Sequence, residues 1–208
     1  MRNYKVLFRS ITFVVTMISK QHITYQVLLL ALLVFGCKPK YSPKPNGYFR
    51  IDFPEKKYIP SLLNYPYQFE YPIYAQLIPD TSNLTEPFWL NITIPKNKTN
   101  IHLSYKPIRN NLNILTEESR ELAYKHAIKA NAINENLFIN DDKKVFGTIY
   151  TIKGNVASTL QFHLTDSISN FVRGSFYISE IPNYDSLKPV IQFYEADIYH
   201  LIETFSWK

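Results

Sequence analysis

The sequence predicts an α+β fold, in which an antiparallel sheet is covered by packed helices, including a long C-terminal helix. Three consecutive segments in the second half alternate apolar and polar residues, with turn residues between them, as in an antiparallel meander. Two other segments repeat apolar residues at helical spacing. Seven prolines between Pro54 and Pro95 exclude long helices from the first half.

Short strands are expected in the first half of the domain. Phe49, Ile51 and Phe53 alternate with polar residues, which predicts a half-buried strand over residues 48–53. Further strands are predicted over three segments, residues 67–71, 89–94 and 101–105.

A first helix is predicted over residues 117–133. Thr116 can cap it, and Glu117 and Glu118 lie in the first turn, where the helix dipole favours negative charge. The apolar and small residues that share one face of this helix are Leu122, Ala123, Ala127, Ala130 and Ile133.

The meander is predicted to have strands over residues 144–153, 155–165 and 170–179. Gly154–Asn155 and the segment Asp166–Ser169 contain the residues that favour turns between them.

The last predicted element is a helix over residues 186–205, with Pro189 in its first turn. It carries a wide apolar stripe, formed by Leu187, Val190, Ile191, Tyr194, Ile198, Leu201, Ile202 and Phe205. A meander followed by a long C-terminal helix resembles the PsbP type of sandwich, and such a likeness in fold says little about function.

Cys37 is the single cysteine of the chain, so it can form neither an internal disulfide nor a zinc site alone. It follows an apolar run from Val27 to Gly36, which is too short for a permanent membrane-spanning helix and has the length of a signal-peptide core. The segment Val34–Cys37 is similar to a bacterial lipobox, although Phe35 is bulkier than usual. Cleavage before Cys37 and attachment of acyl chains there would anchor the protein stably in a membrane. The alternative is a secreted or N-terminally anchored protein with a buried cysteine.

This interpretation divides the chain into three parts. Residues 1–36 are a signal peptide whose true start is Met17 or Met1. Residues 37–47 are the lipidated Cys37 and an extended tether rich in proline and lysine. Residues 48–208 form a single domain. No acidic cluster follows Cys37, which favours the periplasmic face of the outer membrane over the cell surface.

The net charge of +6 reflects the signal peptide more than the domain. Four of the 23 basic residues precede Cys37 and no acidic residue does, so the mature chain carries 19 basic and 17 acidic residues. A charge of +2 leaves no electrostatic footprint for nucleic acid. The lack of further cysteines fits a periplasmic protein that does not rely on disulfides.

No motif for catalysis, metal binding or phosphate binding is present, so we expect a protein that is not an enzyme and has no metal or cofactor. The strongest polar cluster is His163, Asp166 and Ser167, with Arg173 on the following strand. A catalytic triad is defined by geometry rather than by proximity in sequence, so a hydrolase is the least favoured function.

Three residues remain as candidate sites. Ser167 and Ser186 each follow an aspartate, in a pattern that resembles a short O-glycosylation signal of Bacteroidota, although Asp185–Ser186 also suits a helix cap. Trp89 is either a core residue, which we favour, or the contact of a glycan or peptide groove. A periplasmic lipoprotein that binds glycan or peptidoglycan is therefore the second hypothesis for function.

The mature chain as a whole resembles the gliding motility lipoprotein GldD family of Bacteroidota. The likeness is carried by eight segments: residues 41–58, 67–72, 101–106, 124–130, 154–158, 164–167, 171–174 and 201–208. The resemblance implies a cell-envelope lipoprotein required for gliding, in a system tied to type IX secretion. Together with the lipobox, the near-neutral mature chain and the missing catalytic motif, it predicts a palmitate-bearing outer-membrane lipoprotein that supports assembly or stability of the gliding apparatus. It implies other envelope lipoproteins as partners. Of the family's residues, only the lipid-bearing position transfers, to Cys37.

Overall fold

The computed structural model describes Tyr25, residues 51–82 and residues 85–208. The chain divides into two units, Met1–Gly47 and Tyr48–Lys208, and every strand and helix named below belongs to the second. Apart from Tyr25, the predicted signal peptide lies outside the described residues, as do Cys37 and the tether. No helix within the described part is both long and apolar enough to cross a membrane.

The centre of the domain is an antiparallel sheet of seven strands in the order β4-β5-β6-β10-β9-β8-β7. The strands are β4 (Gln76–Pro79), β5 (Leu90–Ile94), β6 (Thr99–Pro107), β7 (Ala130–Asn140), β8 (Val145–Gly154), β9 (Ser158–Thr165) and β10 (Asn170–Ile178). The predicted antiparallel sheet, its three-strand meander and the strands near residues 89–94 and 101–105 are therefore confirmed. All eight residues of the interior strand β9 are buried, because both faces of the sheet are covered there.

The first helix differs from its prediction. Helix α2 spans Leu112–Tyr124, and its N-cap is Asn111 rather than Thr116. The Asn111 side chain accepts from the Arg109 backbone N–H instead of capping the helix, while Thr116 donates to the carbonyl of Leu112. The predicted helix continued to residue 133, but residues 125–129 form a turn and residues 130–133 begin strand β7, which the sequence did not predict.

Helix α3 (Tyr184–Thr204) confirms the predicted C-terminal helix, with small differences at its start. Pro189 lies beyond the first turn, contrary to prediction. The cap is Asn183, whose side chain accepts from the Ser186 N–H at 3.3 Å, so Asp185–Ser186 is not the cap. Its buried residues are Val190, Ile191, Tyr194, Asp197, Ile198, Leu201 and Ile202.

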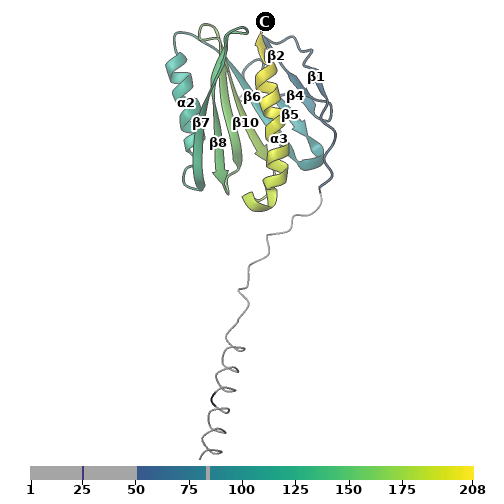
Figure 1. Cartoon of the computed structure of the whole chain (residues 1–208). Helices are drawn as coiled ribbons and strands as arrows, with labels where there is room; N and C mark the ends of the chain where they lie inside the picture. The colour runs from purple at the N-terminus through teal and green to yellow at the C-terminus, as the bar shows by residue number, and fades with distance from the viewer. Residues whose placement is uncertain (1–24, 26–50, 83–84) are drawn as a thin grey trace, which may run out of the picture. The chain divides into compact units, whose positions relative to one another are not determined.

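The two helices cover opposite faces of the sheet. Alternate residues of β10 show this: Val172 and Phe176 belong to the main core with α3, whereas Phe171 and Arg173 face a cavity beneath α2. The smaller core on the α2 side contains Ala123 of that helix. Figure 1 shows α3 running along the sheet and α2 beside β7.

The segment before the sheet packs on α3 and forms two small ladders. β1 (Tyr58–Pro60) pairs with β3 (Glu70–Pro72), and β2 (Tyr67–Gln68) pairs with β11 (Ser206–Trp207) at the end of the chain. The strand predicted over residues 67–71 is thus divided between β2 and β3. Ile51–Phe53 are not in a strand, contrary to prediction, and instead Ile51 and Phe53 pack against the core.

Gly174 tests how tightly the main core is packed. It pairs across the sheet with Phe162, and a Cβ at position 174 would lie 2.1 Å from the tip of that fully buried ring. We expect Gly174→Ala to lower the free energy of unfolding by about 1–3 kcal/mol, as overpacking does. Urea unfolding of the full chain measures the loss.

The control is the same substitution in a Phe162→Leu background, where the ring tip is absent. There Gly174→Ala should cost clearly less than in the wild-type background. Equal costs in the two backgrounds would mean that the clash with Phe162 is not the cause.

Candidate functional site

Asp197 is the most unusual side chain on α3, because a carboxylate that is 1% exposed lies within an apolar stripe. It accepts hydrogen bonds from three side chains of the segment before the sheet. Lys56 Nζ lies 2.6 Å and Tyr58 Oη 2.8 Å from its Oδ1, and Tyr74 Oη donates to Oδ2. Both carboxylate oxygens are therefore hydrogen-bonded, by donors that lie more than a hundred residues earlier in the chain.

Aromatic rings extend this contact toward the start of α3. The rings of Phe53 and Phe193 stack with centroids 4.2 Å apart. Lys56 Nζ lies 3.9 Å from the centroid of the Phe193 ring and donates to the Phe193 carbonyl at 2.8 Å. One cation is thus held by a carboxylate, a carbonyl and a ring face.

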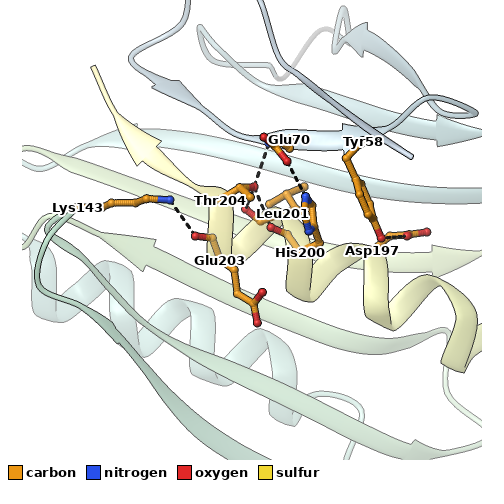
Figure 2. Close-up of polar contacts among 8 residues, drawn as sticks. All are labelled: Tyr58, Glu70, Lys143, Asp197, His200, Leu201, Glu203 and Thr204. Carbon is orange, nitrogen blue, oxygen red and sulfur yellow. Dashed lines mark hydrogen bonds and ion pairs between the residues drawn. The ribbon is translucent and has the colours of Figure 1, made fainter. Parts of the chain in front are cut away.

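A second polar group begins about one turn closer to the end of α3, at His200, and Figure 2 shows it beside Asp197. His200 Nε2 lies 2.7 Å from a carboxylate oxygen of Glu70, and the His200 ring stacks on Tyr58 with centroids 3.7 Å apart. The Glu70 backbone N–H donates to Thr204 Oγ1 at 3.0 Å. These contacts attach β1 and β3 to the same face of the helix.

We call the two groups together the N-terminal clasp. It consists of Phe53, Lys56, Tyr58, Glu70 and Tyr74 on one side, and of Phe193, Asp197, His200 and Thr204 of α3 on the other. Burial, and then the hydrogen bond to Asp197, raise the pKa of Tyr58 and Tyr74 well above the usual range of a phenol. Both phenols therefore remain donors at physiological pH.

The sequence analysis missed the clasp, although one signal was available. Asp197 follows Tyr194 by three residues and precedes Leu201 by four, so helical spacing alone places it in the apolar stripe. A charged residue at such a position requires a partner, but helical spacing cannot name a partner more than a hundred residues away.

The structure does not bring His163, Asp166 and Ser167 together as a triad. The Asp166 Oδ1 accepts three backbone N–H bonds from residues 168–170 in the turn after β9. Partial burial opposes ionisation of Asp166, but these bonds outweigh it and lower its pKa. His163 is 4% exposed and forms no hydrogen bond with either of the other two residues among those described. The hydrolase hypothesis therefore gains no geometric support.

Ser167 and Ser186 are both exposed, at the turn before β10 and in the first turn of α3. Ser167 has a φ of 66°, in the left-handed region, and its N–H donates to Thr165 Oγ1 at 2.9 Å. O-glycosylation at either serine stays a prediction, and exposure is compatible with it.

Trp89 is half-buried, just before β5, and its indole N–H donates to the Tyr105 carbonyl at 2.9 Å. Trp89 also lines a cavity beneath α2, so it is partly buried, as a core residue would be, and also borders a cavity, as a ligand contact would. No group of His, Cys, Asp and Glu that could hold a metal is found within the described ranges.

The chain is similar to known proteins both in its sequence and in its structure. A family model described as "Gliding motility lipoprotein GldD" matches residues 38–207. No curated protein matches the chain. Among solved structures, the chain is similar to cyanobacterial PsbP (CyanoP) from Synechocystis sp. PCC 6803, with 13% identity and a TM-score of 0.44, covering 82% of this chain and 100% of that chain. The α+β class is shown by the chain's own strands and helices.

The clasp predicts that Asp197→Asn lowers the free energy of unfolding by about 2–4 kcal/mol, because the amide cannot satisfy Lys56 and both phenols. Chemical denaturation measures it. The matched control is Asp185→Asn, an exposed aspartate in the first turn of the same helix, which should cost less than about 1 kcal/mol. Similar losses for both variants would show that the clasp contributes no more than a surface charge.

The burial of His163 predicts that the free energy of unfolding depends on pH. Burial lowers its pKa to about 4, and an unfolded histidine titrates near ~6.5. The folded state favours the neutral ring, so this contribution is fully present above pH ~6.5 and is lost as the pH falls through about 4, for a total of roughly 3 kcal/mol at most. His163→Gln should flatten the pH dependence of unfolding between pH ~6.5 and ~4, measured by denaturant titrations. An unchanged slope in this variant would contradict the assignment to His163.

Proposed function

The chain belongs to the gliding motility lipoprotein GldD family, and from this premise we propose that it is a non-enzymatic outer-membrane lipoprotein that supports assembly or stability of the gliding and type IX secretion apparatus. The observation that carries the proposal is the match of the family model to residues 38–207, which begins one residue after Cys37. The lipobox-like segment before that cysteine supplies an independent argument from sequence.

Lipid attachment at Cys37 is the chemical basis of the proposed localisation. Each buried CH₂ contributes roughly 0.8 kcal/mol, so several acyl chains hold a protein on a membrane where a single chain is marginal. The proposed membrane is the outer one, and the domain is placed on its periplasmic side rather than on the cell surface because no acidic export signal follows Cys37.

The clasp supports a role in which the domain works while attached. The first described residues of the domain, 51–74, are those that the chain reaches first from Cys37, and they are held on α3 by Asp197 and His200. A force applied to the chain at an anchored Cys37 would therefore be transmitted to the C-terminal helix through side-chain contacts, before it could open the sheet. Partner proteins in this proposal are other lipoproteins of the motility and secretion machinery.

Envelope fractionation of the wild type and of Cys37→Ser in the native host tests the anchor. We expect wild type in the outer-membrane fraction with incorporation of a palmitate analogue, and a soluble or unprocessed variant with none. The control adds Ser42→Cys to Cys37→Ser, which restores a thiol five residues away from the lipobox and should restore neither property. Identical fractionation of wild type and Cys37→Ser would overturn the anchor.

The role in assembly is tested separately by complementing a deletion strain with wild type or with Cys37→Ser. The proposal expects loss of gliding or of type IX secretion in the deletion strain and restoration by wild type. A deletion strain that assembles the apparatus and secretes normally would contradict it, whatever the outcome for the anchor.

A further inference from the structure

A cavity of about 210 Å³ lies between α2 and the sheet, on the face opposite the clasp. Its roof is one stripe of α2, with Leu115, Glu118, Ser119 and Leu122 at the i, i+3, i+4 and i+7 positions. Its floor is two cross-strand pairs of β6 and β10, Ser104 with Arg173 and Lys106 with Phe171. Trp89 also lines the cavity.

The cavity contains polar groups without partners. Ser119 is 1% exposed, and its hydroxyl has no hydrogen-bond partner among the described residues. The Nε of Arg173 is also buried and unpartnered, while its Nη2 donates to Gln161. Buried polar atoms are nearly always hydrogen-bonded, so two orphan donors on facing walls of one cavity indicate a missing acceptor.

The positive charge of Arg173 favours an acceptor that is negatively charged. A guanidinium stays protonated in proteins, and within the described residues Arg173 forms no ion pair. Burial lowers the pKa of Arg173, and the nearby Tyr177 phenol offsets only part of this effect. Two other charged residues line the cavity: Lys106 forms an ion pair with Glu86 at 3.5 Å, and Glu118 is exposed to solvent. His163 is not among the lining residues, but its ring stacks on that of Phe171. It is neutral near pH 7, because burial lowers its pKa to about 4.

The remaining walls are apolar. Leu115, Leu122, Phe171 and the Trp89 ring surround the space next to the guanidinium. The volume is below that of cavities that take drug-sized ligands, so it suits a group of about one amino-acid residue. The planar fork of an arginine matches the two oxygens of a carboxylate.

We propose that this cavity binds a carboxylate joined to a small apolar group, with Arg173 and Ser119 holding the carboxylate and the Trp89 side of the cavity holding the apolar part. Two sources share this chemistry: the hydrophobic C-terminal residue of a peptide, and a free hydrophobic acid. This inference concerns the α2 face and does not depend on the lipid anchor or on the role in gliding.

Fluorescence of Trp89 tests the proposal in the full-length protein in detergent micelles. The chain has two tryptophans, so Trp207→Phe leaves Trp89 as the reporter. The probes are the acetylated tripeptide Ala-Ala-Leu, its C-terminal amide and N-acetyl-leucine. We expect the tripeptide acid to bind saturably and its amide to bind at least about 10-fold more weakly, because the amide cannot pair with the guanidinium.

The three probes distinguish the two sources. Similar affinities for N-acetyl-leucine and the tripeptide acid support the cavity as a site for a free acid, and clearly tighter binding of the tripeptide supports a peptide terminus. Equal binding of acid and amide would overturn the proposal. Absence of saturable binding of all three would also overturn it and would assign the orphan donors to ordered water.

Substitutions in the cavity distinguish binding at this site from binding elsewhere on the protein. In the Trp207→Phe background, Arg173→Gln should weaken binding of the acid by at least about 10-fold, and Ser119→Leu should abolish it by filling the cavity. The matched control is Arg109→Gln, an exposed arginine outside the cavity, which should leave binding unchanged. If Arg173→Gln does not fold, as judged by circular dichroism, Ser119→Leu decides alone. Unchanged affinity in a folded Ser119→Leu variant would contradict the site.

Discussion

The buried carboxylate of Asp197 is the constraint on which the arrangement of the N-terminal segment depends. A charge at that depth is tolerated only if its oxygens are paired, and here Lys56, Tyr58 and Tyr74 supply the donors. These three residues belong to a segment with short ladders of its own, so its position on α3 is set by side chains more than by backbone pairing. The stacking of Phe53 on Phe193 and of Tyr58 on His200 then fixes the same segment along two turns of the helix.

The two faces of the sheet differ in the polarity of the side chains that they bury. The α3 face holds the main apolar core, where the lack of a side chain at Gly174 leaves room for the ring of Phe162. The α2 face buries polar side chains, among them Gln161 and His163, under a helix of only 13 residues. A short helix with Ser119 at its centre leaves room above Arg173. One face therefore stabilises the domain and its N-terminal segment, while the other has the unfilled space and unpaired donors expected of a binding site.

Much of the fold was predictable because its signals are local. Strands β8 to β10 alternate in the sequence and are separated by turn residues, and α3 repeats apolar residues at helical spacing over its whole length. Strand β7 was not predictable, because this edge strand leaves Leu137 and Ile139 exposed and begins with small residues that continue a helical pattern from α2. The partners of Asp197, and the cavity shared by Trp89, Ser119 and Arg173, depend on contacts between distant segments. Sequence spacing places each of these residues on an element but does not show which elements meet.

Native-state hydrogen exchange of the N-terminal segment tests most directly whether the clasp makes this segment and α3 one cooperative unit. The amides to follow are those of Ser61, Phe69 and Ile73, which are hydrogen-bonded outside the central sheet, with Ile198 and Leu201 of α3 as reference. If the clasp acts as described, both groups exchange only through global unfolding and show the same free energy of opening. A lower opening free energy for the first group, with α3 still protected, would show that the segment detaches from a stable domain and would contradict the account.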